Sequence, residues 1–298
     1  MGAFLTALFT GLRLGSVYAL VALGYTMVYG IIKLINFAHG DFIMVGAYAL
    51  FFTVPILKAA GVPAWLGVIA AVIVCAAVGM ATELAAYRPV RKTGTNMTAL
   101  ITAIAVSLVL ENLAQAIPAI GPNPRTVDSI FAAGGVSISG ATLSWATLIT
   151  IIVSLVIMLV LYTFTRSTKL GRAMRAVSED KQAATLIGIS VNSTILITFA
   201  IGAGLAGVAA LMYVAQYPAA TNVMGATLGL YAFVAAVLGG IGSIPGAMLG
   251  GFVIGLIYSF SSAYISSSLA STFVYLILIA VLLVKPEGML GKNVGEKV

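Results

Sequence analysis

The longest stretch of this chain without an ionisable side chain limits what the chain can fold into. Residues 182–284, 103 in succession, include no Asp, Glu, Lys, Arg or His. A helix needs about 20 residues to cross a hydrocarbon core about 30 Å thick, so this run has room for about four spans. The whole chain is 61% hydrophobic and 8% charged, against about half and a quarter in a soluble domain. A soluble enzyme, a nucleic-acid-binding protein and a protein with a single membrane anchor are therefore excluded.

The other apolar runs predict further spans. They are continuous for about 16 to 25 residues and do not alternate with period two, as the strands of a membrane β-barrel do. In lipid, a helix satisfies all of its backbone polar groups within one segment. We therefore expect an all-α polytopic membrane protein, a single domain over residues 1–298, with about eight or nine transmembrane helices, some of them broken. The expected spans are residues 14–32, 42–57, 65–82, 95–110 and 143–165, and four more in the charge-free run, which splits at 216–222, 239–246 and 266–271.

Basic residues indicate the orientation, because Lys and Arg are retained on the cytoplasmic side of a membrane. Eleven of the 15 fall into three clusters. The clusters are Arg88, Arg91 and Lys92; Arg166, Lys169, Arg172, Arg175 and Lys181; and Lys285, Lys292 and Lys297. Two expected spans separate the first cluster from the second and four separate the second from the third, so all three fall on one side. The composition does not decide the side of the N-terminus.

Residues 166–192 carry helix signals of their own within a basic loop. Ser178 is the expected N-cap and Gly188 the C-terminal stop. Glu179 and Asp180 fall in the first turn, where carboxylates complement the helix dipole. A helix of about nine residues rises about 14 Å, which is too short to cross the membrane. We expect a short cytoplasmic helix that docks on a partner; the alternative is that the basic residues only fix the topology.

A polar segment, residues 36–48, separates two apolar runs. It holds Asn36, the single histidine His39, Gly40 and Asp41. Ionisable groups at membrane depth are costly and usually face a cavity or a partner. One interpretation is a broken helix beside a water-filled path. The other is a short loop at the cytoplasmic boundary, in which Asp41 caps the next helix.

A glycine-rich segment, residues 235–255, combines a Gly-Pro break with small residues. The proline interrupts the glycine spacing of a dinucleotide fingerprint, and no loop of the chain ends in Gly-Lys-Ser/Thr. Any energy from ATP must therefore come from another polypeptide. The break predicts a tight turn or an interrupted helix, and the small residues after it allow close helix packing; the alternative is that discontinuous helices line a substrate path. These small residues are Gly246, Gly250, Gly251 and Gly255.

No set of side chains in the sequence indicates catalysis or a metal site. Cys75 is the only cysteine, and neither Glu83 nor Glu111 has a nucleophile or a second carboxylate beside it in the sequence. Glu83, close to Arg88, is expected to form an ion pair at the interface or to snorkel. Glu111 is a candidate for facing a polar cavity.

Four motifs in order resemble those of the permeases of branched-chain amino acid ABC transporters. They are GSVYALVALGYTMVYGIIKLINFAHGDF, AYRPVR, GRAMRAVSEDKQAATLIGI and LGGIGSIPGAMLGG. The resemblance extends from Gly11 to Gly291. It is closest to the shorter of the two permease subunits of the high-affinity leucine/isoleucine/valine importer.

This resemblance implies a multi-pass protein of the bacterial inner membrane that is not itself an enzyme. A second homologous permease would complete the pore, two cytosolic ATPase subunits would bind ATP and Mg²⁺, and a periplasmic amino-acid-binding protein would deliver the substrate. This chain would bind no cofactor and no metal. Related importers of urea or short amides look similar, and a proton-coupled secondary transporter that uses Asp41, Glu83 or Glu111 is a further alternative.

The resemblance also implies two sets of site residues. The expected ATPase-coupling residues are Gly171, Arg172, Arg175, Glu179, Asp180, Ala184 and Gly188. The substrate path is implied only generally, at the two breaks. Its candidates are Asn36, His39, Gly40, Asp41, Gly240, Gly242 and Ser243.

Overall fold

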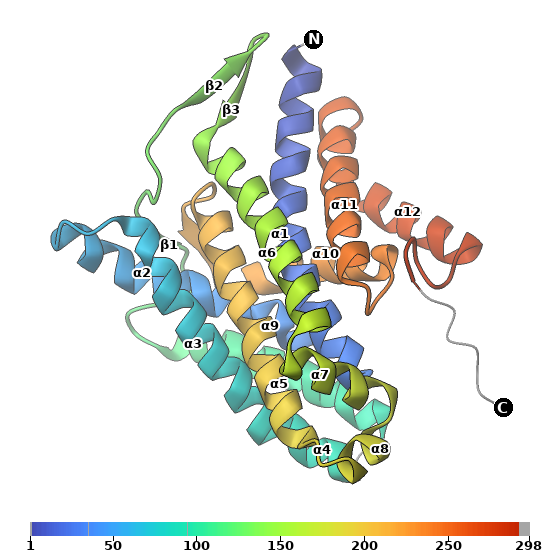
Figure 1. Cartoon of the computed structure of the whole chain (residues 1–298). Coiled ribbons are helices and arrows are strands. Elements are labelled where there is room, and N and C mark those ends of the chain that lie inside the picture. The colour runs from blue at the N-terminus through green and yellow to red at the C-terminus, as the bar shows by residue number, and fades with distance from the viewer. Residues whose placement is uncertain (1, 35, 94, 292–298) are drawn as a thin grey trace.

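The computed structural model describes residues 2–34, 36–93 and 95–291 and shows a bundle of helices (Figure 1). Its apolar helices are α1 (Gly2–Ile32), α2 (Asp41–Ala59), α3 (Gly67–Thr82), α5 (Asn96–Ala116), α6 (Trp145–Ser167), α9 (Val191–Val214), α10 (Met224–Gly239), α11 (Ile244–Tyr264) and α12 (Ala270–Val284). Within the described ranges, seven helices are long and apolar enough to cross a membrane, and the apolar helices α10 and α12 are shorter. The predicted class, an all-α polytopic membrane protein, is confirmed.

The charge-free run forms four helices, α9 to α12, as expected. The connections between them are residues 215–223, 240–243 and 265–269. Gly240, with a φ of +103°, follows the end of α10. Ser243 caps α11, because its Oγ accepts a hydrogen bond from the amide of Gly246 at 3.2 Å. Pro245 lies in the first turn of α11. Backbone N–H groups in the first turn have no partner within the helix, so the N–H that proline lacks costs no helical hydrogen bond. The Gly-Pro segment is therefore a tight turn between two helices.

Glycines set the packing of α11 against its neighbours. Gly250 faces the backbone of Ala235 in α10, whereas Gly251 faces the backbone of Ala19 in α1. A side chain at either glycine would meet backbone atoms, so the helices come this close only because glycine is present. The interpretation of this stripe as close helix packing is confirmed.

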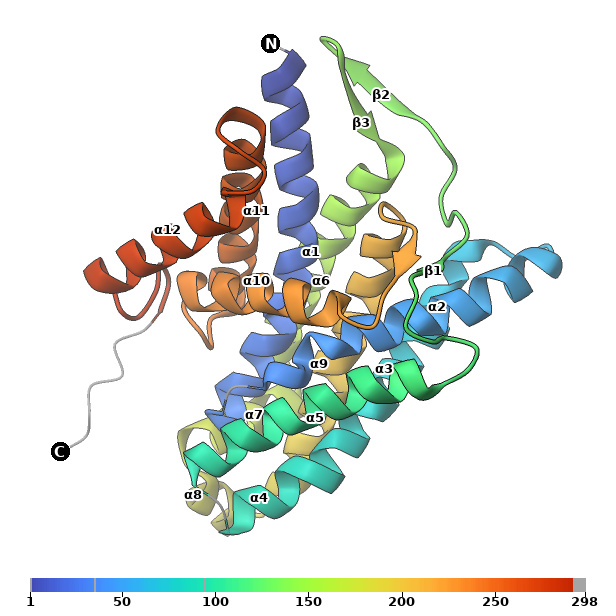
Figure 2. The same ribbon diagram turned by 180° about the vertical axis from the view of Figure 1, so that it is seen from behind.

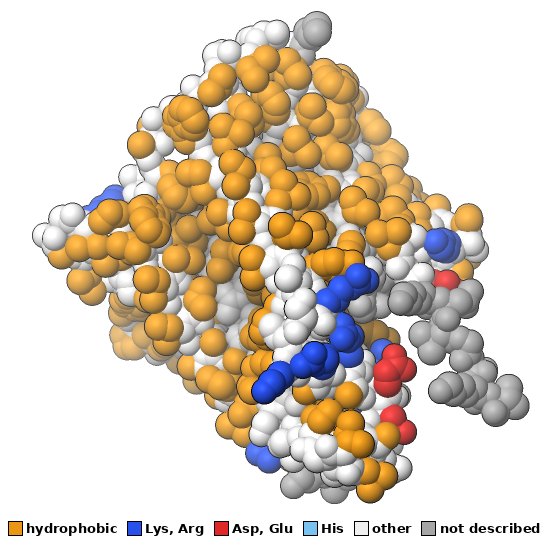
Figure 3. Space-filling view, viewed as in Figure 1, with side chains coloured by type: hydrophobic (Ala, Val, Ile, Leu, Met, Phe, Trp, Pro, Cys, Tyr) orange, Lys and Arg blue, Asp and Glu red, His pale blue; other side chains and the backbone are white. Residues whose placement is uncertain are grey.

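The central helix of the bundle is α1, which packs against α6, α9, α10 and α11. Its residues from Leu14 to Val28 are all buried. By contrast, α3, α5 and α6 leave large apolar side chains exposed, among them Ile73, Ile101 and Leu159. The outer face of the bundle is accordingly apolar (Figure 3), as a surface in contact with lipid tails must be.

Lys and Arg side chains gather at one end of the molecule (Figure 3), which we call the basic end. It is formed by α4 (Arg88–Thr93), α7 (Lys169–Glu179) and α8 (Lys181–Leu186). Arg91 of the first basic cluster lies close enough to Lys181 of the second to lower the pKa of the Lys181 amine, in addition to the effect of partial burial. The first two basic clusters therefore lie side by side. The chain after Lys285 returns to the α10–α11 turn, where the Met289 amide donates to the Leu238 carbonyl at 2.8 Å. The described parts of the three clusters thus share one end; Lys292 and Lys297 lie outside the described residues.

Short strands lie at the opposite end, in connections that the sequence predicts only as loops. They are β1 (Arg125–Thr126), β2 (Gly135–Ile138), β3 (Ala141–Ser144) and β4 (Ala219–Ala220). β2 and β3 form an antiparallel hairpin that projects beside the start of α1 (Figure 2), and β1 pairs antiparallel with β4. The β1–β4 pair ties the connection between α5 and α6 to the connection between α9 and α10.

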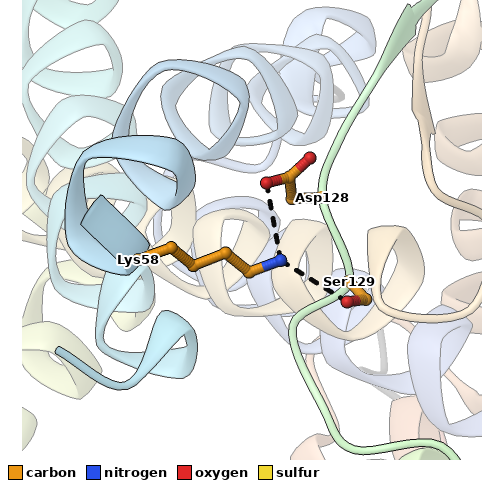
Figure 4. A network of polar contacts seen from close by, with 3 residues as sticks. All are labelled: Lys58, Asp128 and Ser129. Atoms are coloured by element: carbon orange, nitrogen blue, oxygen red, sulfur yellow. Dashed lines mark hydrogen bonds and ion pairs between the residues drawn. The ribbon is translucent and has the colours of Figure 1, made fainter. Parts of the chain in front are cut away.

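Ionic and backbone contacts close this opposite end and fix the direction of α1. The Lys58 Nζ atom, in the last turn of α2, lies 3.4 Å from an oxygen of Asp128 and 3.4 Å from the hydroxyl of Ser129 (Figure 4). Gly2 lies against the backbone of Ser139 in the hairpin. Because α1 begins at the hairpin and leads to Lys33 at the basic end, the N-terminal end of α1 lies opposite the basic clusters.

Candidate coupling and translocation site

α7 lies on the apolar helices by one face. Gly171, Met174 and Val177 recur every third residue and are buried where α7 packs against α6, α1 and α9. Gly171 also permits the tight turn after α6, since a side chain there would collide with the carbonyl oxygen of Phe164. The predicted coupling residues that α7 leaves exposed are Arg172, Arg175 and Glu179. α7 is thus an amphipathic helix, held by its apolar face with its charged face outward.

The helix boundaries in this element differ from the prediction. Ser178 is not an N-cap, because it lies inside α7, where its hydroxyl donates to the carbonyl of Arg175 at 2.7 Å. Asp180 separates α7 from α8 and caps α8, accepting a hydrogen bond from the amide of Gln182 at 2.7 Å. Glu179 ends α7 instead of starting a helix. The prediction was wrong because Ser and Asp both favour N-cap positions, so the sequence does not choose between Ser178 and Asp180. In the structure Asp180 has an extended backbone, which brings its carboxylate to the first amides of α8.

α8 ends as predicted. Gly188 has a φ of +84°, and its amide donates to the carbonyl of Thr185 at 3.0 Å, which closes the last turn. Ala184 is buried and faces inward. Leu186 and Ile187, at the tip, are 88% and 73% exposed. Two large apolar side chains thus stand exposed side by side at the end of α8.

A cleft of about 410 Å³ opens at the basic end. We call it the basal cleft; its walls are α7, the C-terminal ends of α1 and α6, and the turn between α10 and α11. Gly171, Arg175 and Glu179 of the predicted coupling set line it, and so do Gly242 and Ser243 of the predicted path. The structure therefore brings together parts of two sets that are far apart in the sequence. Any movement of α7 changes the shape of this cleft directly.

Four of the other predicted path residues, Asn36, His39, Gly40 and Asp41, lie in a buried junction between α1 and α2, whereas Gly240 lies in the turn after α10. A 3₁₀ turn, Phe37–His39, joins the two helices, and Asp41 starts α2 without making a side-chain capping bond. Asn36, His39 and Asp41 are at most 2% exposed, so the interpretation as an ordinary boundary loop is wrong. The Oδ1 atom of Asn36 accepts a hydrogen bond from the hydroxyl of Tyr87 at 2.8 Å. None of these residues lines the basal cleft.

Glycines allow neighbouring helices to close on this junction. A side chain at Gly24 of α1 would collide with the ring of His39, and one at Gly229 of α10 would meet the backbone of Gly40. The His39 ring lies beside the backbone of Val21 in α1, and the Asp41 carboxylate lies beside the hydroxyl of Ser107 in α5. The break in the helix is therefore a tightly packed joint around buried polar groups, and its place in a substrate path stays a prediction.

A second buried polar site follows α3, in a π-helical turn, Glu83–Tyr87. Glu83 forms the expected ion pair, but with Arg91 and not with Arg88. Single π-turns inside α-helices often mark functional sites. Arg91 and Tyr87 are not among the predicted site residues, and the AYRPVR motif is the sequence signal that points to them.

This architecture defines the class of protein to which the chain belongs. It is a multi-pass α-helical membrane protein with a pair of short helices, α7 and α8, attached to a cleft at one end of the bundle. In the part of the chain that the structure describes, no group of three or more His, Cys, Asp or Glu side chains is placed to hold a metal ion.

Comparison with known proteins gives the family. Residues 7–282 match the family described as "Branched-chain amino acid transport system / permease component", and the chain belongs to this family. It is 42% identical to the high-affinity branched-chain amino acid transport system permease protein LivH of Escherichia coli (strain K12), over 99% of this chain and 98% of LivH. LivH of Salmonella typhimurium is also 42% identical, over the same shares of the two chains. BraD, the corresponding permease protein of Pseudomonas aeruginosa, is 41% identical, again over 99% and 98%.

Proposed function

We propose that this chain is the membrane-spanning permease subunit of a bacterial ABC importer that moves branched-chain amino acids across the inner membrane. The observation that carries the proposal is its 42% identity, over almost the full length of both chains, to a permease of such a system. The basic end faces the cytoplasm in this proposal, because Lys and Arg are retained on that side. The hairpin end then faces the periplasm.

The proposal requires other subunits. The sequence has no loop ending in Gly-Lys-Ser/Thr, so two separate cytosolic ATPase subunits would bind ATP and Mg²⁺ and hydrolyse the ATP. This chain would bind no cofactor of its own. A second homologous permease would complete the pathway, and a periplasmic amino-acid-binding protein would deliver the substrate.

α8 is the part of the chain that we expect to enter a groove on the ATPase. Burying an exposed apolar side chain contributes about 1.5 to 3 kcal/mol, so Leu186 and Ile187 together provide a strong anchor. α7 transmits the movement, because Met174 and Val177 are packed into the bundle while Arg175 lines the basal cleft. Closure of the ATPases would shift α7 as a rigid body and reshape the cleft.

Transport by the assembled importer tests the proposal. Vesicles that contain this chain, the second permease, the ATPases and the binding protein should take up radiolabelled leucine when ATP is supplied. Vesicles with this chain alone should take up none, even with a proton gradient imposed. Proton-driven uptake by the chain alone would refute the proposal, and uptake of urea or acetamide without uptake of leucine would reassign the substrate.

Two pairs of substitutions test the coupling element. Arg172→Glu with Arg175→Glu should abolish the ATPase activity that the binding protein stimulates, while the protein still inserts into the membrane. Leu186→Ala with Ile187→Ala should weaken ATPase binding more than about tenfold, because two apolar contacts are lost. Thr185→Ala is the matched control, since it trims an exposed polar side chain of the same helix. Full stimulation in both pairs would contradict the assignment.

A further inference from the structure

The basal cleft holds ionic groups beyond those assigned to ATPase coupling. Lys33 at the end of α1 and Arg166 at the end of α6 line it, together with Arg175 and Glu179 of α7. None of these four side chains takes part in an ion pair with another described residue. Arg166 lies over the ring of Tyr162 at 4.3 Å, a contact that supplies no counter-charge. Among residues 2–34, 36–93 and 95–291, the cleft therefore presents three cations and one carboxylate that form no ion pair.

The remaining wall of the cleft combines hydroxyl groups with a set of apolar side chains. Met27 and Ile31 of α1, Met174 of α7 and Ile244 of α11 contribute to it. A volume of about 410 Å³ falls in the range of small-molecule sites, about 300 to 1,000 Å³. Cations, one carboxylate and these apolar side chains together complement a molecule with a carboxylate, an ammonium group and an aliphatic tail. A simple anion would satisfy the cations but would leave Glu179 without a counter-charge.

We propose that the basal cleft binds a free aliphatic α-amino acid from the cytoplasmic side and that this binding slows transport. The carboxylate lies against Lys33, Arg166 and Arg175, the ammonium group against Glu179, and the side chain against the methionines. This proposal rests on the proposed function, because it makes the imported cargo the ligand.

The position of the ligand explains why occupancy slows the cycle. A bound amino acid touches α7 on one side and the turn at Gly242 and Ser243 on the other. A ligand that binds one arrangement of two elements more tightly than another shifts the equilibrium toward that arrangement. The ligand therefore holds α7 in its observed position, against the movement that ATPase closure requires. The importer then responds to the concentration of its own product.

Direct binding tests the site. The full chain in nanodiscs of phosphatidylcholine should bind radiolabelled L-leucine saturably. Lys33→Gln and Arg166→Gln should each weaken binding about tenfold or more, because each removes a charged hydrogen-bond donor to the ligand carboxylate. Lys169→Gln is the matched control, since this exposed lysine of α7 does not line the cleft and should bind leucine like the wild type.

Analogues and lipids distinguish the possible ligands. 4-Methylpentanoate, which lacks the ammonium group, and 3-methylbutylamine, which lacks the carboxylate, should each bind at least about tenfold more weakly than leucine. The proposal is overturned if leucine does not bind, or if its binding is the same in the Lys33 and Arg166 variants. Binding of phosphatidylglycerol, lost in these two variants while leucine does not bind, would assign the cleft to an anionic lipid headgroup and would also overturn it.

A transport assay separates this inference from the proposed function. Leucine added on the cytoplasmic side of the assembled importer should slow uptake, and the Lys33→Gln importer should need about tenfold more leucine for half inhibition than the Lys169→Gln importer. Absence of ATP-driven uptake in the wild type would refute the proposed function. Normal uptake that cytoplasmic leucine does not slow would refute only the regulatory role of the cleft.

Discussion

Replacing Gly251 by alanine would test the contact between α1 and α11 on which the centre of the bundle depends. The added Cβ would lie 2.5 Å from the backbone nitrogen and Cα of Ala19 and 2.6 Å from its Cβ. Ordinary contacts begin at 3.4 Å, so the two helices must separate by 0.9 Å at this point, the difference between 3.4 and 2.5 Å. Two of the three nearest atoms belong to the backbone, so rotation of a side chain does not relieve the clash.

The cost can be worked out from this geometry. Overpacking a close interface costs about 1 to 3 kcal/mol, and the upper value applies where nothing flexible can give way. Against this cost, alanine inside a helix is more favourable than glycine by about 0.5 to 1 kcal/mol, because the unfolded chain loses less conformational entropy on folding. The free energy of unfolding should therefore fall by about 2 kcal/mol. In soluble domains of about 150 to 250 residues, each kcal/mol of lost stability lowers the Tm by about 2 to 4 °C, so this loss should lower the Tm by about 4 to 8 °C.

Thermal unfolding in detergent, followed by size-exclusion chromatography, measures this change. The matched control is Gly204→Ala in α9, where the added Cβ would meet its nearest neighbour, a methyl carbon of Val72, at 3.4 Å. The control should leave the Tm unchanged or raise it slightly, because alanine favours the helix. A Tm for Gly251→Ala equal to that of the control would refute the argument that backbone proximity sets the packing of α1 and α11.

Three further outcomes concern the basic end. Arg91→Ala leaves the buried carboxylate of Glu83 without its counter-charge, which should cost about 3 to 5 kcal/mol of stability, seen as a lower Tm; Glu83→Gln with Arg91→Gln should recover part of the loss. Asp180→Ala removes the cap of α8 and should destabilise that helix by about 0.5 to 2 kcal/mol, lowering stimulated ATPase activity, whereas Asp180→Asn should keep most of it. Partial burial and the nearby Arg91 lower the pKa of the Lys181 amine in the folded chain. At alkaline pH the unfolded chain therefore binds more protons than the folded chain, so the free energy of unfolding should rise with pH up to the unfolded pKa of about 10.4. Lys181→Gln should flatten that rise in a pH series of thermal melts.

Most helices of the bundle could be predicted because their signals are local. Each span is an apolar run about as long as the bilayer is thick, and each break has turn residues of its own. The turn at Gly240, the cap at Ser243 and the stop at Gly188 lie where the sequence places them. The small residues of α11 also pack closely, as expected, because no other residue type allows backbones to come so near.

Other features could not be predicted because they depend on geometry that several elements share. Glu83 pairs with Arg91 and not with Arg88, because the π-turn after α3 changes which positions fall on one face. The choice of Asp180 over Ser178 as a cap depends on where α7 stops, and α7 is positioned by its burial against α6, α1 and α9. Neither the ion-pair partner of Glu83 nor the end of α7 can be predicted from the neighbouring residues in the sequence.

The sequence by itself determined that the chain spans a membrane many times, that its basic clusters share one side and that it carries no nucleotide-binding loop. The bilayer imposes these properties on composition and on run length, and both can be counted along a chain. Only the tertiary structure decided that Asn36, His39 and Asp41 are buried at a helix junction. It alone assembled the basal cleft from Lys33, Arg166 and Glu179, because a cleft between helices is made by residues that are neighbours only after the helices pack.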